Sequence, residues 1–443
     1  MKIASVWIQG YRSIRDLRLE GLGAANIFYG PNGAGKSNIL SALRLFGDLL
    51  RLRAIVGVDG LERPLSELGL RERDLCTYSD APRIVLGVEI GPGARPVAVP
   101  LPGRDLTRLR IELTVDISGS KGTLGLSRLE DAETGQDLVA YAASPEGGPL
   151  RGVLGGAIPD TLFSLIPAVR ALSEERSELA GPAQGAPGRA ARGLQSLIRQ
   201  GRLKEALFQA KNSPSLRAQE SYERLRSLLS GPPLDRPPFN VVRDPETGEY
   251  DLQEIVARPD GERQARSLDL AGLGTQQVYS ILASILLSDA YAVGLEEPES
   301  HLHGPSSGRH LRVLLRRILD ERRAVQQLFI ATHSGLFDLD PTGYWDVRLD
   351  PTLGTLVERR ALIDVDRRHL FETSPARHAL MDMLRYLPEG QIVFRHADGR
   401  GLTGPEMIRL LQEDDPDALA FLDAVAGAAV NAVRVRAKRS ETS

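Results

Sequence analysis

The chain has 443 residues, which is long enough for one large domain or for two to three ordinary domains with a proper core. Its 55 Lys and Arg against 58 Asp and Glu exclude a global electrostatic field that would indicate nucleic acid or a membrane surface as partner. A single cysteine, Cys76, excludes a disulfide framework and a cysteine-based zinc site. Because no run of about eighteen apolar residues occurs, we predict a cytoplasmic protein.

The N-terminal segment is predicted to be a small sheet that leads into a helix. Apolar residues alternate over 2–9 and over 14–19, which is typical of strands. A third short strand, 27–29, precedes a glycine-rich loop, and the apolar spacing after that loop predicts a helix from Lys36 to about Arg53.

The glycine-rich loop fits the pattern G-x-x-x-x-G-K-[ST] of a phosphate-binding loop between a strand and a helix. Its glycines allow backbone conformations that other residues avoid, so that successive N–H groups can point at a polyphosphate. Lys36 would supply a charge for the β- and γ-phosphates, and Ser37 a hydroxyl for Mg²⁺. The nucleotide contacts predicted in this stretch are Gly30, Asn32, Gly33, Ala34, Gly35, Lys36, Ser37 and Asn38.

The middle of the chain changes from strand to helix periodicity and back again. An antiparallel sheet is predicted from strands at 83–90, 96–99, 109–117 and 122–129. Amphipathic helices are then predicted at 161–179, 194–208 and 221–229, which we interpret as a helical insertion over about 159–237. A hairpin, 239–242 with 250–257, returns the chain to sheet.

A second group of candidate residues follows this hairpin. The segment 271–275 opens a predicted helix, 276–287, whose N-terminal N–H groups suit an anion. A strand then ends in two adjacent acids, of which Glu296 would hold Mg²⁺ through water and Glu297 would polarise the attacking water. After a helix at 306–322, another apolar strand ends at His333, which can bond a γ-phosphate or its attacking water.

Several of these residues also have ordinary structural interpretations. The two acids precede Pro298 and can be an exposed strand end that turns. Arg12, in a bend near the loop, can reach a phosphate or be a solvated turn residue. His301 and His303 lie beside an acid and invite a metal interpretation, but no closed ligand set completes it, so we favour a contact with a second subunit.

These motifs, in this order, resemble the ABC-type ATPases of the RecF, SMC and OLD (overcoming lysogenisation defect) group over about residues 1–340. The stretches that carry the resemblance are 11–14, 30–37, 166–170, 272–277, 295–303 and 331–334. The resemblance implies an α/β fold, namely an ABC-type P-loop NTPase head with a β-rich antiparallel subdomain, a helical insertion and a small α-rich C-terminal region. The divisions implied are 1–158 for the lobe with the phosphate loop, 159–237 for the insertion, 238–345 for the lobe with the acids, and 346–443 for the extension.

The same resemblance implies that two heads close face to face around ATP and Mg²⁺. The signature segment of one copy would then meet the ATP held by the other copy, and Arg12 would contact a phosphate. The signature residues implied are Gly272, Gly274 and Thr275. The catalytic residues implied are Lys36, Glu297 and His333, and the metal ligands are Ser37 and Glu296.

The sequence departs from the family pattern at two points. The signature segment 272–277 lacks the serine that transporter-type members place before two glycines, so that Thr275 supplies the hydroxyl or none does. No glutamine occurs between Gln9 and Gln136, so the usual glutamine ligand of Mg²⁺ cannot be placed. Both departures concern the rate of turnover more than nucleotide binding.

The C-terminal part is predicted to be a hairpin, 345–360, followed by helices around 376–387, 404–413 and 418–435. Many OLD proteins continue into a Toprim nuclease domain, which needs a strand-terminal Glu and an Asp-x-Asp pair to hold metal ions. Here the acids 414–417 follow no buried strand. We therefore predict no nuclease in this chain.

The predicted function is a Mg²⁺-dependent ATP hydrolase whose ATP-driven dimerisation controls a separately encoded effector protein, in a defence-type system. One alternative is an ATPase that clamps DNA during repair or chromosome maintenance, which would require a basic stripe and salt-dependent binding. Another is a scaffold that binds ATP and turns it over very slowly. No membrane partner is expected.

Overall fold

The computed structural model describes residues 2–53, 61–79, 81–92, 99–101, 104–168, 194–199, 201–258, 260–302, 305–321, 325–337, 339–340, 343–360, 383–384, 387–388, 390–395, 401–412, 421 and 425. By their internal contacts the residues form two units. The first unit is Met1–Thr332 with Phe337–Arg359, and the second is His333–Leu336 with Arg360–Ser443. All predicted nucleotide-site residues except His333 belong to the first unit.

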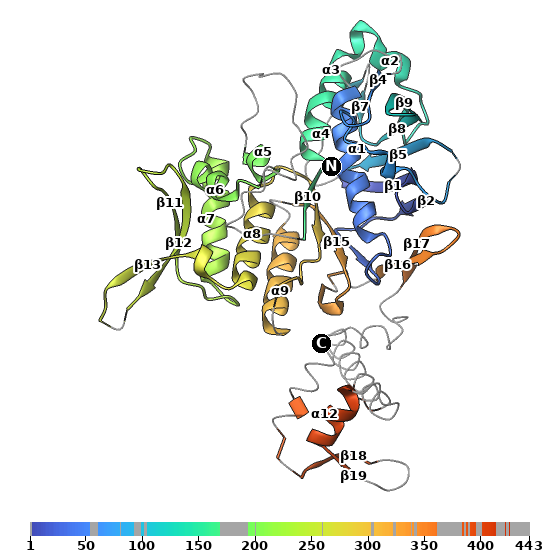
Figure 1. The fold of residues 1–443 in the computed structure, drawn as a ribbon. Coiled ribbons are helices and arrows are strands. Elements are labelled where there is room, and N and C mark those ends of the chain that lie inside the picture. Colours follow the sequence, from blue (N-terminus) through green and yellow to red (C-terminus); the bar gives the residue numbers. More distant parts are fainter. Residues whose placement is uncertain are drawn as a thin grey trace, which may run out of the picture. The chain divides into compact units, whose positions relative to one another are not determined.

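A mixed sheet, with twelve strands in the described residues, forms the centre of the first unit (Figure 1). In order across the sheet the strands are β10 (Phe163–Ile166), β14 (Ala292–Glu296), β15 (Gln327–Thr332), β3 (Ala25–Tyr29), β16 (Tyr344–Asp350), β17 (Gly354–Arg360), β2 (Ile14–Glu20), β1 (Lys2–Tyr11), β5 (Arg83–Gly91), β8 (Leu109–Ser118), β9 (Lys121–Asp131) and β4 (Leu61–Pro64). The first five pair in parallel, and the strands from β2 to β4 pair antiparallel. This arrangement confirms the predicted α/β fold with an antiparallel subdomain.

The parallel strands are apolar because both of their faces are covered. Every residue of β15 is buried, and so is every residue of β14 except Glu296. Helix α1 (Lys36–Arg53) packs on β10 and β15 and has the bounds that the sequence predicts. Helix α9 (Pro305–Glu321) buries its predicted stripe, which consists of Leu311, Leu314, Leu315 and Ile318. Helix α1 and the strands it packs on share one hydrophobic core, which includes Phe28, Phe46 and Phe329.

The antiparallel strands follow the predicted alternation. In β8 the buried residues are Leu109, Ile111, Leu113, Val115 and Ile117, with half-buried or exposed residues between them. The strand predicted at 96–99 lies almost wholly outside the described residues. The short elements that complete this part are η1 (Glu72–Asp74), β6 (Val99–Leu101), β7 (Arg104–Leu106), α2 (Val139–Ala143), η2 (Pro145–Gly147), α3 (Gly148–Gly152), η3 (Val153–Ala157) and α4 (Ile158–Thr161).

The predicted helix over 161–179 is wrong over the described residues 162–168, whereas Thr161 ends helix α4. Residues Phe163–Ile166 form strand β10, which pairs in parallel with β14. A stretch this short fits both the helix and the strand period. Hydrogen bonding to β14 makes it a strand. Residues 169–193, the rest of this prediction and the linker after it, lie outside the described residues.

The remaining helices of the insertion differ from prediction in their bounds. The helix predicted over 194–208 is two helices, α5 (Leu194–Arg199) and α6 (Leu203–Lys211), because the chain turns at Gly201, whose φ is 77°. The helix predicted over 221–229 is longer, and α7 (Leu216–Ser230) packs against α8 (Leu273–Leu287). Figure 1 shows these helices together beside a small sheet.

That small sheet has the order β11 (Phe239–Arg243), β12 (Tyr250–Ala257) and β13 (Arg263–Ser267), and all its strands are antiparallel. The hairpin of β11 and β12 was predicted. Strand β13 was not, because its polar sequence Arg-Gln-Ala-Arg-Ser is almost wholly exposed and has no apolar alternation. A helical turn, η4 (Leu268–Leu270), connects β13 to α8.

The second unit contains a hairpin, β18 (Ile392–Arg395) with β19 (Gly401–Thr403), and helix α12 (Gly404–Gln412). Leu384, Met407 and Leu411 form its small core. The helix predicted at 404–413 is confirmed, whereas those predicted at 376–387 and 418–435 lie mostly outside the described residues. The predicted hairpin at 345–360 corresponds to β16 and β17 in the first unit.

Candidate nucleotide site

The phosphate loop and the acid pair follow strands that flank β15, at the same edge of the sheet. Strand β3 leads into the phosphate loop, and β14 ends in the acids. The parallel register pairs Tyr29 with Thr332, Glu296 with Ala331, and Ile166 with Leu295. The carboxyl ends of β3, β15, β14 and β10 are therefore adjacent, which is where ligands bind in α/β sheets.

The backbone of the phosphate loop takes the left-handed conformations that its glycines allow. Gly33 and Gly35 have φ values of 79° and 102°, which favour glycine. The Lys36 side chain is buried and lies over the loop, where its Nζ donates to the carbonyl oxygens of Gly30 at 2.7 Å and Pro31 at 2.8 Å. Burial lowers the pKa of Lys36, and the carboxylates of Glu297 and Glu299 oppose that shift. The loop lysine and the acids are thus electrostatic neighbours.

Thr355 of β17 supports the loop from a distant part of the sequence. Its Oγ1 lies 2.7 Å from Ser13 Oγ and donates to the Ala34 carbonyl at 3.1 Å. The Asn38 side chain donates to the same Ser13 hydroxyl at 2.7 Å. A Cβ at Gly35 would lie only 2.1 Å from Thr355 Oγ1. Thr355 therefore requires a glycine at position 35, and no sequence motif indicated this pair.

Arg12 lies beside the start of α1. It has a φ of 52°, and its Nε donates to Asp74 Oδ1 at 2.8 Å while Nη1 donates to Asn38 Oδ1 at 3.4 Å. Its side chain is 38 % exposed. Asp74, which sequence analysis missed, holds the guanidinium next to the loop, so a role for Arg12 at a phosphate stays a prediction with a suitable geometry.

The acid pair ends β14 in an unusual conformation. Glu296 is the last strand residue, and Glu297 has a φ of 41°, a region that a non-glycine residue occupies at a cost of about 1–3 kcal/mol. The Glu297 N–H donates to the Ala331 carbonyl of β15 at 2.8 Å, and Ser300 Oγ donates to Glu297 Oε2 at 3.3 Å. The chain therefore fixes the Glu297 carboxylate at the strand ends.

A third acid, Glu299, was given no role by sequence analysis. Thr332, the last residue of β15, donates from Oγ1 to Glu299 Oε1 at 2.6 Å. This bond ties the described residues after β14, 297–302, which we call the acid loop, to the end of β15. His333 follows Thr332 in the chain and belongs to the second unit, so its predicted contact with phosphate stays a prediction.

The residues at the strand ends suit ATP with Mg²⁺. Mg²⁺ is commonly held by one or two carboxylates together with substrate phosphates. Ser37 is exposed at the start of α1, and Glu296 is half-buried at the end of β14. Within the described residues no group of three or more His, Cys, Asp or Glu can hold a metal ion by itself. Pro167 and Ala168 follow the carboxyl end of β10, at the same edge of the sheet as the phosphate loop. Neither side chain has an oxygen that could replace the glutamine ligand of Mg²⁺ that this sequence lacks.

The signature segment packs against the acid loop of its own chain. Gly272 is the N-cap of α8, and the buried Gln277 donates from Nε2 to the Pro298 carbonyl at 3.0 Å. A Cβ at Gly274 would lie 2.7 Å from the His301 carbonyl oxygen. In contrast, Leu270 is 83 % exposed and Leu273 is 50 % exposed. The segment is therefore fixed on one side and presents apolar side chains on the other.

Gly274→Ala is expected to destabilise the protein by about 1–3 kcal/mol, because the added methyl group meets backbone that cannot move cheaply. The melting temperature should fall by several degrees in a thermal scan. Gly272→Ala is the matched control, since nothing lies within 4 Å of its Cβ position and its φ is −59°. A fall in Gly272→Ala as large as that in Gly274→Ala would contradict the close approach of the acid loop.

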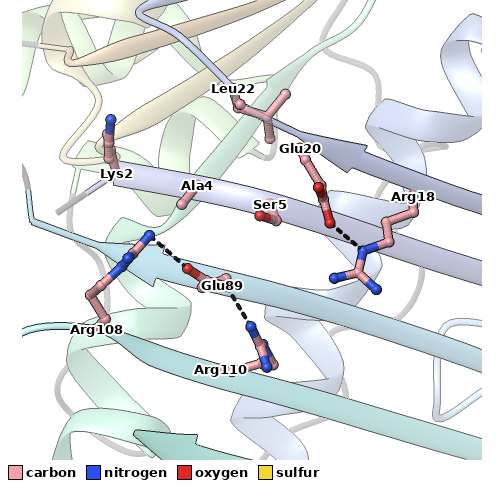
Figure 2. Close-up of a pocket in the computed structure, with 10 residues that line it drawn as sticks. Lys2, Ala4, Ser5, Arg18, Glu20, Leu22, Glu89, Arg108 and Arg110 are labelled. Carbon is pink, nitrogen blue, oxygen red and sulfur yellow. Dashed lines mark hydrogen bonds and ion pairs between the residues drawn. The ribbon is translucent and has the colours of Figure 1, made fainter. Parts of the chain in front are cut away.

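A separate cavity of about 380 Å³ lies on the antiparallel part of the sheet (Figure 2). Its walls come from β1, β2, β5 and the start of β8. Figure 2 shows that its arginines bind acids within it: Arg108 and Arg110 both bind Glu89, and Arg18 binds Glu20. None of its lining residues belongs to the phosphate loop or the acid loop. The predicted nucleotide site at the strand ends is therefore separate from this cavity.

The strand order and the phosphate loop define a P-loop nucleotide-binding domain. A family model described as "AAA domain, putative AbiEii toxin, Type IV TA system" matches residues 25–91 and 158–340, more than half of the chain. The chain therefore belongs to this family of AAA-type ATPase domains. This membership confirms the resemblance inferred from the sequence at the level of an ATPase domain.

Other proteins share parts of the sequence or the fold. The "Uncharacterized protein MJECL10" of Methanocaldococcus jannaschii is 52% identical over 44 residues, which are 10% of this chain and 20% of that protein. The SMC head domain from Thermotoga maritima aligns with 82% of this chain and 100% of its own at 13% identity, with a TM-score of 0.44. An SMC head bound to the C-winged helix domain of ScpA aligns with 82% and 98% at 13% identity, with a TM-score of 0.49. An SMC head from Pyrococcus furiosus, bound to the C-terminal domain of ScpA, aligns with 82% and 97% at 12% identity, with a TM-score of 0.46.

Proposed function

We propose that the protein is a Mg²⁺-dependent ATP hydrolase, that ATP joins two copies of it face to face, and that this pairing controls a separately encoded effector in a defence-type system. The observation that carries the proposal is the placement of the phosphate loop, the acid pair and Thr332 at adjacent strand ends. Membership of the ATPase family supports nucleotide binding at that edge. No helix in the described part of the chain is long and apolar enough to cross a membrane.

The residues divide the chemistry among them. In this proposal the loop N–H groups and Lys36 bind the phosphates, and Ser37 and Glu296 would hold the metal ion. Mg²⁺, when bound, neutralises part of the phosphate charge. Glu297 polarises the attacking water, whereas the role of His333 at the γ-phosphate stays a prediction from the sequence, since His333 belongs to the second unit. The positive φ of Glu297 supports its role, because strained backbone is concentrated at functional sites.

The exposed side of the signature segment supports pairing of two copies. Leu270 and Leu273 are apolar side chains in water next to the N-terminus of a 15-residue helix. Burial of exposed apolar side chains stabilises association by about 25 cal/mol per Å² of area removed from water. In the proposed pair this surface covers the nucleotide bound by the other copy, which a single chain leaves open to solvent.

Leu273→Glu is expected to weaken ATP-dependent self-association at least tenfold, because it places a charge in the buried surface. The measurement is the molar mass in light scattering after gel filtration with a slowly hydrolysed ATP analogue. Leu216→Glu is the control. Leu216 is 74 % exposed at the start of α7. Its neighbour Arg217 pairs with Asp289, which follows the C-terminal end of α8, whereas the signature segment lies at the N-terminal end of that helix. Leu216 is therefore remote from the proposed interface. Equal pairing of the two variants would argue against the proposed interface.

The effector part of the proposal is supported by the family description, which names a toxin–antitoxin system. Affinity purification with and without ATP, followed by nuclease treatment, tests it. A stable protein partner that survives nuclease supports control of an effector. Capture of DNA in its place, with affinity that falls steeply with salt, supports a DNA clamp. ATP binding with no measurable turnover supports a scaffold.

A further inference from the structure

The small sheet contains a fully buried carboxylate outside the nucleotide site. Glu254 of β12 is 0 % exposed and accepts four hydrogen bonds. Its Oε1 accepts from Arg236 Nε at 2.9 Å, from Arg236 Nη2 at 2.7 Å and from Tyr279 Oη at 3.0 Å. Its Oε2 accepts from Arg266 Nη2 at 2.7 Å. With three donors on Oε1 and one on Oε2, this carboxylate joins several elements of the chain at one point.

The donors come from both sides of the signature segment. Arg266 lies on β13, just before the turn that leads to Gly272, and Tyr279 lies on α8, just after that segment. Arg236 comes from the connection between α7 and β11. Glu254 therefore holds the two ends of one stretch, 267–278, against a common point on the small sheet.

The electrostatics make this junction sensitive to the loss of any member. Burial raises the pKa of Glu254, but hydrogen bonds from Arg266 and Arg236 outweigh burial, so its pKa lies below the ordinary value and it is ionised at neutral pH. Burial and the Glu254 charge raise the pKa of Tyr279, which keeps its hydroxyl protonated as a donor. Removing Glu254 takes the acceptor from Arg236 and from the buried Tyr279 hydroxyl, and a buried polar group left unpaired costs more than its bond contributes.

We propose that Glu254 is a positioning residue, which fixes the signature segment through Tyr279 and Arg266 so that Gly272–Thr275 can meet the nucleotide of a second copy. The inference rests on the proposed function. It adds that the small sheet, β11 to β13, holds the signature segment in the position in which it can contact a second copy. The acid loop contacts the segment at Gly274 and Gln277, and the Glu254 junction holds its ends.

Tyr279→Phe tests the junction with the smallest change, because it removes the hydroxyl and keeps the ring. Tyr222→Phe is the matched control. Both rings contact Phe239 edge to face with centroids 5.6 Å apart, but of the two hydroxyls only that of Tyr279 donates to Glu254 in the described residues. We expect Tyr279→Phe to weaken ATP-dependent pairing about tenfold while a single copy binds ATP with unchanged affinity. Tyr222→Phe should pair like wild type.

Amide hydrogen exchange over 268–277, in the absence of nucleotide, is the second measurement. Exchange there should be at least tenfold faster in Tyr279→Phe than in wild type, and unchanged in Tyr222→Phe. Glu254→Gln should show a larger effect, since it leaves two arginines without their counter-charge. Exchange equal to wild type in Tyr279→Phe would overturn the inference. If wild type fails to pair with ATP, the proposed function fails, while exchange still decides whether the junction positions the segment.

Discussion

Lys36→Ala is expected to lower the affinity for ATP at least about 100-fold, the largest effect on binding of any single change in the chain. In the structure Lys36 Nζ donates to two loop carbonyls, Gly30 O and Pro31 O. A polyphosphate in the cradle offers charged acceptors to the same ammonium group. Hydrogen bonds to charged groups contribute about 1.5–3 kcal/mol each, so loss of contacts to two phosphates accounts for a factor of this size.

Isothermal titration with ATP and Mg²⁺ measures the change. Lys211→Ala is the control. Like Lys36, the Lys211 ammonium donates to two oxygens, Asn240 Oδ1 and Val241 O, but it lies outside the phosphate loop. Lys211→Ala should bind ATP like wild type. Retained affinity in Lys36→Ala, with normal folding by circular dichroism, would remove the loop from its assigned role.

Local sequence patterns predicted β3, β14 and β15 of the parallel part, but not β10, and they indicated the candidate site residues. The apolar run before the loop, the helix from Lys36 and the acidic strand end are short-range signals, since each depends on neighbouring residues. The error at Phe163–Ile166 has a physical cause. A four-residue apolar run carries no period of its own, and its partner β14 lies far along the chain.

The parts of the site that sequence did not predict are long-range contacts. Thr355 reaches Ser13 across 342 positions, and Asp74 reaches Arg12 across 62. Neither contact belongs to a motif, because a threonine or an aspartate in a polar stretch is ordinary by itself. Glu254 lies in a predicted hairpin, yet its burial depends on Tyr279 and on β13, a strand without strand periodicity. Such residues can be identified from their contacts in the folded structure, but not from a local sequence pattern.

Glu297→Gln is expected to leave ATP binding intact and to slow hydrolysis about 10²–10⁴-fold, the range typical of a lost general base. The amide keeps the size of the side chain and an oxygen that accepts from Ser300, so the strand end should keep its shape. It cannot take a proton from water. ATP-bound pairs should therefore accumulate, which phosphate release and light scattering on the same sample can follow.

Glu299→Gln is the informative comparison, since it makes the same change two positions along the chain. Its amide oxygen still accepts from Thr332, and we expect hydrolysis within about tenfold of wild type, because the bond that ties Glu299 to the end of β15 is kept. If Glu299→Gln stops turnover and Glu297→Gln does not, Glu299 is the base. In that case the left-handed backbone at Glu297 serves to turn the chain so that Glu299 reaches the end of β15.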